Sequence, residues 1–122
     1  MANVRVGFIG CGGIANGKHF PGMAQQGGVD MCAFCDLILE RAEKAAKEYG
    51  TPDAKVYTDY HELLADPTID AVHVLTPNVA HCEITVAALE AGKHVLCEKP
   101  MAATPADAKK MLEAIDRTGK ML

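Results

Sequence analysis

The sequence predicts an α/β fold, in which a parallel, doubly wound sheet carries helices on both faces. Short apolar runs alternate with helical patterns along the chain. Consecutive parallel strands need a right-handed crossover, and a helix between them supplies it. The first apolar run also ends in a glycine-rich turn that opens a helix, which is typical of a Rossmann-type sheet. The expected strand order is 3-2-1-4-5-6.

The predicted strands are short and apolar, and they follow one another at the spacing of βαβ units. They cover residues 4–9, 29–35, 56–57, 71–75 and 94–97, and residues 120–122 form the start of a sixth strand. The fourth is buried on both faces except at His73, and a lone histidine in such a strand is more often a satisfied core residue than a ligand.

The helices are predicted from their apolar periodicity and their capping residues. They cover residues 13–26, a segment through 42–49 that ends at Gly50, a short one through 63–64, residues 80–91 and residues 105–118. Asp59 and Thr104 are the expected N-caps, and Gly119 ends the last helix. Pro21 lacks an amide hydrogen, so the first helix should kink or break between Asn16 and Pro21.

Composition excludes several classes of function. The 122 residues are 49% hydrophobic and 23% charged with a net charge of −4, which predicts one globular domain without the basic surface that nucleic acids require. No apolar run approaches the ~20 residues that span a bilayer, and no signal peptide pattern is present, so we expect a soluble, cytoplasmic protein with no membrane partner.

The five cysteines are odd in number and lie mostly in predicted strands and helices, so we expect buried thiols in a reducing compartment. Cys32 and Cys35 have the spacing of a redox or zinc pair. In a strand, however, such residues point to opposite faces, and no second Cys/His pair has metal spacing. We therefore predict no metal site.

The glycine-rich turn has the pattern of a dinucleotide site, G-x-G-x-x-A. Gly10 permits a tight turn, Gly12 leaves room for a phosphate, and Ala15 lets the helix lie close to the strand. The first helical turn, which includes Gly13 and Ile14, offers free N–H groups to a pyrophosphate. A structural glycine turn in another α/β protein is the alternative.

Asp36 ends the second predicted strand, where a carboxylate can accept both ribose hydroxyls of the adenosine half. A 2′-phosphate would meet a like charge there, so NAD is favoured over NADP. Arg41 keeps NADP possible, because it lies one helical turn further on and could reach a phosphate or stack on adenine. The alternative for Arg41 is a surface ion pair with Glu40 or Glu48.

Two further motifs follow the fourth and fifth strands, namely Leu75-Thr76-Pro77-Asn78-x-x-His81 and Glu98-Lys99-Pro100. Together with the glycine motif and Asp36, T-P-N-x-x-H and A-G-K-H-V-x-x-E-K-P resemble the N-terminal domain of the glucose-fructose oxidoreductase / inositol dehydrogenase (Gfo/Idh/MocA) family. The resemblance runs over nearly all of the chain, and E-K-P is its specific part.

The resemblance implies an NAD(P)-dependent oxidoreductase that transfers hydride between nicotinamide and a sugar, cyclitol or related polyol. Lys99 corresponds to the lysine that acts beside the nicotinamide ribose and substrate hydroxyl. Between an apolar strand and a proline it should be partly desolvated, which would suit acid/base work; an exposed, strand-capping lysine is the alternative. The resemblance also suggests a cis Lys99–Pro100 bond, which the sequence does not decide.

The cofactor-binding set follows from the motifs and the resemblance together. Thr76 should contact the cofactor through its backbone and hydroxyl, and Asn78 and His81 should lie near the nicotinamide ribose. Capping or packing is an equal alternative for His81. The full set is Gly10, Gly12, Gly13, Ile14, Asp36, Arg41, Leu75, Thr76, Asn78, His81, Glu98 and Lys99.

The family's second α/β domain, with its substrate pocket, oligomer interface and Asp-x-x-x-His pair, has no counterpart in residues 1–122. We therefore expect the dinucleotide-binding domain of a longer, homo-oligomeric enzyme, which binds cofactor with little or no turnover by itself. The alternatives are a non-catalytic dinucleotide-binding sensor or regulator on the same fold and a small stand-alone dinucleotide-binding protein.

Overall fold

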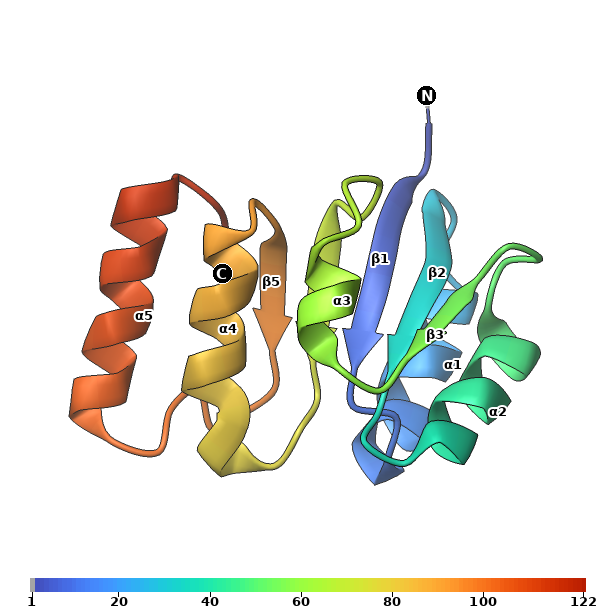
Figure 1. Cartoon of the computed structure of the whole chain (residues 1–122), viewed down its shortest axis with the longest axis horizontal. Coiled ribbons are helices and arrows are strands. Elements are labelled where there is room, and N and C mark those ends of the chain that lie inside the picture. The colour runs from blue at the N-terminus through green and yellow to red at the C-terminus, as the bar shows by residue number, and fades with distance from the viewer. Residues whose placement is uncertain (1) are drawn as a thin grey trace.

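The computed structural model describes residues 2–122 and contains one parallel, five-stranded sheet (Figure 1). The strand order is β3-β2-β1-β4-β5, as predicted for these strands. The strands are β1 (Val4–Ile9), β2 (Val29–Cys35), β3 (Lys55–Tyr57), β4 (Ala71–Val74) and β5 (His94–Cys97). The order reverses between β1 and β4, so the carboxyl ends of these two strands form the switch point where ligands of such sheets bind.

The predicted helices are confirmed, with ends that shift by a few residues. They are the π-helical turn η1 (Ala15–His19) with α1 (Phe20–Ala24), α2 (Leu39–Tyr49), α3 (Tyr60–Leu64), the 3₁₀ turn η2 (Asn78–Ala80) with α4 (His81–Glu90), and α5 (Pro105–Thr118). The side chains of Asp59 and Thr104 cap α3 and α5, and Gly119 ends α5 in the left-handed conformation.

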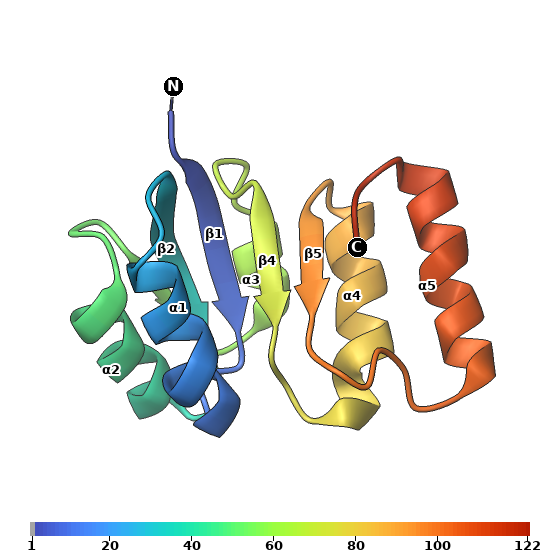
Figure 2. The ribbon, with the colours of Figure 1, turned by 180° about the vertical axis from the view of Figure 1, so that it is seen from behind.

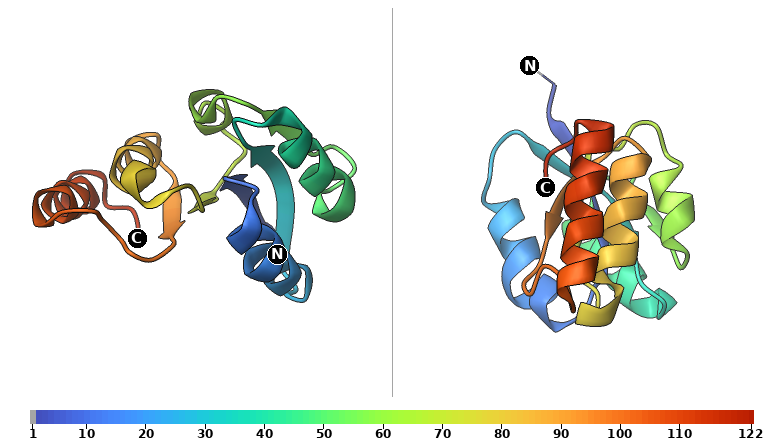
Figure 3. Two further views of the ribbon diagram at one scale, coloured as in Figure 1. Left: turned by 90° about the horizontal axis from the view of Figure 1, so that it is seen from below. Right: turned by 90° about the vertical axis from the view of Figure 1, so that its left-hand side faces the viewer.

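Two apolar clusters pack on opposite faces of the sheet. One cluster, which includes Phe8, Phe20 and Phe34, joins η1, α1 and α2 to the first face. The other, which includes Leu63 and Leu89, joins α3 and α4 to the second face. Helix α5 packs beside α4 at the end of the molecule, as the two views in Figure 3 show. The prediction of helices on both faces is confirmed.

The expected sixth strand does not form among the described residues. Residues 120–122 return to β5, where the Val95 amide donates a 2.9 Å hydrogen bond to the Met121 carbonyl. One main-chain bond does not make a ladder, so the sheet ends at β5. Leu96 on this edge strand remains 49% exposed.

Pro21 does not break the first helix, but the helix is irregular in the segment where a kink or break was expected. The Phe20 amide donates to the Ala15 carbonyl, a five-residue step that widens the helix into a π-helical turn just before the proline. The residues at this junction all keep right-handed helical angles. Figure 2 shows η1 and α1 running without interruption in front of the sheet.

The expectation that Cys32 and Cys35 point to opposite faces is wrong. The pairing of β1 with β2 steps from Val6–Met31 to Gly7–Ala33, so Cys32 is the extra residue of a β-bulge. The bulge turns both cysteines into the same apolar cluster. Burial raises the pKa of both thiols, that of Cys35 to about 12, so neither provides the thiolate that redox or zinc chemistry needs.

Phe8 holds the first apolar cluster together, and we expect Phe8→Ala to lower the free energy of unfolding by about 3–5 kcal/mol. The ring is fully buried, with the Phe20 and Phe34 rings at centroid distances of 5.0 and 5.4 Å. Urea unfolding followed by circular dichroism measures the change. Leu112→Ala, at a side chain that is 55% exposed on α5, serves as the control and should change stability by less than about 0.5 kcal/mol.

Candidate functional site

Gly10 lies at the centre of the switch point and has no room for a side chain. Its φ is +103°, and a Cβ atom there would lie 2.7 Å from the carbonyl carbon and oxygen of Leu75. The turn after β1 therefore packs directly on the main chain that follows β4. The prediction that Gly10 permits a tight turn is confirmed, and the structure adds a close contact that only glycine allows.

The first turn of the following helix leaves space beside it. A Cβ on Gly13 would meet nothing within 4 Å, and one on Gly12 would meet only the Arg41 guanidinium, at 3.8 Å. The amides of Gly12, Gly13 and Ile14 precede any helical carbonyl that could accept them. The Asn16 side-chain amide donates to the carbonyls of Cys11 and Gly12 at 2.9 and 2.8 Å, which fixes the turn.

Asp36 reaches from the end of β2 to this turn. One carboxylate oxygen accepts the Cys11 amide at 2.9 Å, and the other accepts the Ile38 amide at 2.8 Å. A carboxylate has about four acceptor positions, so two remain for other donors. Asp36 thus orders the glycine turn while keeping acceptors free at the edge.

Arg41 lies at the start of α2 with its side chain exposed beside Gly12. Among residues 2–122 no ion pair involves Arg41, so the predicted alternative of a pairing with Glu40 or Glu48 does not form. Leu37, between Asp36 and α2, is 91% exposed. A cation and an apolar side chain therefore flank the carboxylate.

The segment after β4 presents a buried hydroxyl. The Leu75 amide bonds to the Ile9 carbonyl at 2.8 Å, which continues the β1–β4 pairing to the sheet edge. The Thr76 side-chain oxygen is buried and has no hydrogen-bond partner within residues 2–122. Asn78 opens η2 and is exposed. An unsatisfied buried hydroxyl at the ligand edge fits a site that a further polar group completes.

His81 is buried and links the two loops at this edge. One ring nitrogen lies 2.8 Å from the Thr76 carbonyl, and the other lies 2.7 Å from the Pro100 carbonyl. A carbonyl oxygen can only accept a hydrogen bond, so a ring N–H of His81 is the donor to these loops. Both of its nitrogens are engaged, which favours the packing alternative over direct contact with a cofactor.

Lys99 follows β5, and its peptide bond to Pro100 is cis. The side chain is exposed in this chain, so the expectation of a partly desolvated lysine is wrong for the described residues. Leu96, three residues earlier on β5, is also half exposed. The Lys99 amide donates to the Glu98 carboxylate at 3.0 Å.

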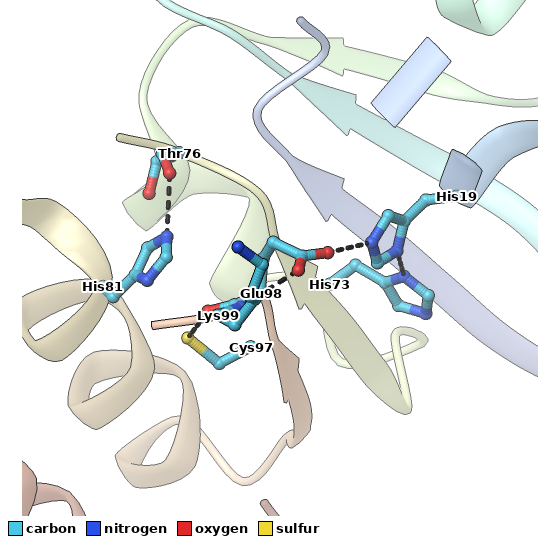
Figure 4. A network of polar contacts seen from close by, with 7 residues as sticks. All are labelled: His19, His73, Thr76, His81, Cys97, Glu98 and Lys99. Atoms are coloured by element: carbon cyan, nitrogen blue, oxygen red, sulfur yellow. Dashed lines mark hydrogen bonds and ion pairs between the residues drawn. The ribbon is translucent and has the colours of Figure 1, made fainter. Parts of the chain in front are cut away.

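Glu98 also belongs to a network that the sequence did not reveal (Figure 4). Its second carboxylate oxygen lies 2.7 Å from His19 Nε2, and His19 Nδ1 lies 2.8 Å from His73 Nδ1. His73 is buried and bonded, so its prediction as a satisfied core histidine is confirmed, whereas its expected exposure on one face of β4 is wrong.

Burial and hydrogen bonding set the charges of this network. Burial, with a smaller effect from nearby His19, lowers the pKa of His73 to about 4, so the ring is neutral at neutral pH. The hydrogen bond from His19, followed by that from the Lys99 amide, lowers the pKa of Glu98, which keeps the carboxylate ionised. The network therefore presents one fixed negative charge beside Lys99.

Sequence and structure comparisons assign this site to a family. Residues 4–122 match the family model described as "Oxidoreductase family, NAD-binding Rossmann fold". The chain belongs to the Gfo/Idh/MocA oxidoreductase family.

Several relatives support the assignment. An uncharacterized oxidoreductase of Rhizobium meliloti is 40% identical over 100% of this chain and 36% of its own length. The inositol 2-dehydrogenase of Salmonella typhimurium is 38% identical over 98% of this chain and 35% of its own. The D-glucoside 3-dehydrogenase of Escherichia coli is 39% identical over 98% of this chain and 33% of its own. The chain thus spans about a third of the length of these curated relatives.

Solved structures agree with the sequence comparisons. The 3-ketoreductase KijD10 of Actinomadura kijaniata, in complex with TDP-benzene and NADP, superposes with a TM-score of 0.90 at 31% identity. The match covers 98% of this chain and 37% of KijD10. An NAD-binding protein from Listeria innocua superposes with a TM-score of 0.86 at 33% identity, over 98% of this chain and 34% of its own. The chain is therefore an NAD(P)-binding Rossmann domain of the Gfo/Idh/MocA family.

The geometry fits a dinucleotide. The glycine turn leaves open space beside the amides of the first helical turn. At the same edge the buried Thr76 hydroxyl has no hydrogen-bond partner among residues 2–122. Among residues 2–122 no three His, Cys, Asp or Glu side chains are arranged to hold a metal ion. In the same range no helix has both the length and the apolar character needed to cross a bilayer.

His73 should make stability depend on pH. Its folded pKa of about 4 lies below its ordinary value of 6.5, so the unfolded state binds more protons between these values and stability falls as pH drops from 6.5 to 4. The effect amounts to about 3 kcal/mol at pH 4.

Urea unfolding from pH 4 to 8 measures this dependence in the wild type and in His73→Phe. The variant should lose less stability than the wild type over that interval. His61→Phe, at an exposed histidine on α3, is the matched control and should keep the wild-type slope. Equal slopes for wild type and His73→Phe would contradict the prediction.

Proposed function

We propose that this chain is the dinucleotide-binding domain of an NAD(P)-dependent oxidoreductase that acts on a CH–OH group of a sugar, cyclitol or related polyol. The relatives support this substrate class, because they include an inositol 2-dehydrogenase, a D-glucoside 3-dehydrogenase and a 1,5-anhydro-D-fructose reductase. The observation that carries the proposal is that an open glycine turn, a carboxylate after β2 and a lysine after β5 lie at the same edge of the sheet.

The pyrophosphate is held by the first helical turn rather than by the whole glycine loop. The Gly10 amide already bonds to the Cys35 carbonyl, and the Cys11 amide bonds to Asp36. The amides of Gly12, Gly13 and Ile14 remain, and they lie at the positive end of the helix dipole. The exposed Arg41 guanidinium beside Gly12 adds a positive charge to the same place.

Asp36 binds the adenosine ribose and favours NAD. Its two remaining acceptor positions match the two ribose hydroxyls, and its negative charge opposes a 2′-phosphate. Arg41 instead favours NADP, because a guanidinium can bind the 2′-phosphate. The structural neighbour KijD10 was solved in complex with NADP, which supports keeping NADP as the second candidate cofactor.

Lys99 is the catalytic residue of this domain in our proposal. A bound nicotinamide supplies the hydride acceptor or donor. The Lys99 ammonium, exposed at the end of β5, polarises the substrate oxygen and shares its proton. Glu98 and His81 fix the main chain on either side, through the Lys99 amide and the Pro100 carbonyl.

The substrate pocket and the oligomer interface are proposed to lie outside this chain. The curated relatives are about three times as long as the segment they share with it. This chain alone should bind dinucleotide without measurable turnover. Titration with NADH, followed by nicotinamide fluorescence, tests the proposal directly. A folded sample that binds neither NADH nor NADPH would contradict it.

Gly12→Ala should weaken NADH binding by about tenfold or more and leave stability nearly unchanged. The added methyl group would occupy the space beside the free amides, where the pyrophosphate lies in this proposal, while meeting no main-chain atom of the protein. Gly22→Ala in α1, also in open space, is the matched control. It should keep wild-type affinity, and equal affinities for the two variants would argue against a phosphate site at this turn.

Asp36→Asn should shift the affinity ratio toward NADPH by about tenfold, because the amide keeps an acceptor for the Cys11 amide but removes the charge that opposes a 2′-phosphate. Parallel fluorescence titrations with NADH and NADPH measure the ratio. Asp30→Asn, at a carboxylate near the start of β2, is the control and should leave the ratio unchanged. An unchanged ratio in Asp36→Asn would remove Asp36 from cofactor selection.

A further inference from the structure

The Glu98 carboxylate joins two parts of the site that are far apart in the sequence. One oxygen accepts the Lys99 amide at 3.0 Å, and the other bonds to His19 Nε2 at 2.7 Å. His19 ends η1, the helical turn that follows the glycine turn, whereas Glu98 follows β5. Figure 4 shows Glu98 between His19 and the Lys99 main chain.

His19 itself is held from behind by β4. Its Nδ1 lies 2.8 Å from Nδ1 of His73, whose ring packs on Phe8 at a centroid distance of 4.8 Å. His73 is 7% exposed and neutral at neutral pH, so it offers one hydrogen-bonding nitrogen to His19 without competing charge. Both ring nitrogens of His19 are thus engaged, and its ring has one fixed orientation.

The Lys99 side chain has no such restraint. Within residues 2–122 its ammonium makes no hydrogen bond or ion pair, and the residue is exposed. The position of its main chain therefore decides where the ammonium can reach. The Glu98 carboxylate is the only side chain of the described residues that bonds to the Lys99 amide.

We infer that His19 is a positioning residue for Lys99. His19 acts through the Glu98 carboxylate, and it thereby couples the helix after the glycine turn to the turn that carries the lysine. This inference rests on the proposed function, because that function gives Lys99 its role. It assigns His19 no contact with cofactor or substrate. A change at His19 should therefore alter the lysine turn and turnover more than dinucleotide affinity.

The first measurement is made on this chain in solution. The ¹⁵N–¹H shift of the Lys99 amide should titrate with the Glu98 carboxylate, whose pKa is lowered chiefly by the His19 bond. The charged and titratable groups that face Glu98 and His19 are Lys99 and His73. In His19→Phe the midpoint should rise toward the ordinary carboxyl value, and in His19→Gln, whose amide can still donate, it should rise less. NADH affinity should stay within about twofold of wild type in both.

The second measurement uses the complete protein with NAD⁺ and myo-inositol as the probe substrate. His19→Phe should lower kcat by about tenfold or more with little change in KM for NAD⁺, and His19→Gln should recover part of the loss. His61→Phe is the control and should keep the wild-type Glu98 midpoint and kcat, because the exposed His61 ring bonds to Asp59 and makes no contact with Glu98 or Lys99 among residues 2–122.

The outcomes separate the inference from the proposed function. If the Glu98 midpoint, observed at the Lys99 amide, is unchanged in both His19 variants, the inference is overturned, whatever the activity. A wild-type chain that binds neither NADH nor NADPH would overturn the proposed function, while the Glu98 midpoint would still decide whether His19 acts through Glu98. If His19→Phe is unfolded, His19→Gln decides both measurements.

Discussion

The absence of a side chain at Gly10 is the constraint on which the whole site depends. The turn after β1 lies so close to the Leu75 carbonyl that a methyl group would overlap it. This contact brings the first helical turn and the segment after β4 to one point of the sheet edge. A larger residue would separate the two halves of the edge, even if every other side chain of the motif were kept.

Two carboxylates then order the edge in the same way. Asp36 accepts the amides of Cys11 and Ile38, and Glu98 accepts the amide of Lys99 and the ring N–H of His19. Each of them fixes a turn by binding its main chain and links that turn to another element. Charged acceptors suit this purpose, because their hydrogen bonds are shorter and stronger than neutral ones. Hydrogen bonds within the chain therefore fix both turns of the site.

The sequence predicted the parts of the molecule that depend on local patterns. The order of the first five strands follows from the alternation of strands and helices, and Asp36 after β2 and the capped α5 follow from local patterns; the structure confirms all three. The bulge at Cys32 could not be predicted, because it depends on the register with β1. The bonds of His19 with Glu98 and His73 join three separate elements, so no local spacing reveals them. The π-helical turn did have a sequence signal, because Pro21 lies within an otherwise helical pattern, but this signal did not specify a π-helical turn.

The exposure of Lys99 has a consequence for how such a site works. A solvated ammonium polarises an oxygen weakly, because water screens its charge. The described residues fix the lysine main chain through Glu98 and His81 but leave its side chain in water. Leu96, three residues earlier on the edge strand, is also half exposed. In our proposal the domain therefore sets the position of the lysine in advance, and its electrostatic strength arises only when nicotinamide, substrate and the remaining protein cover it and exclude water.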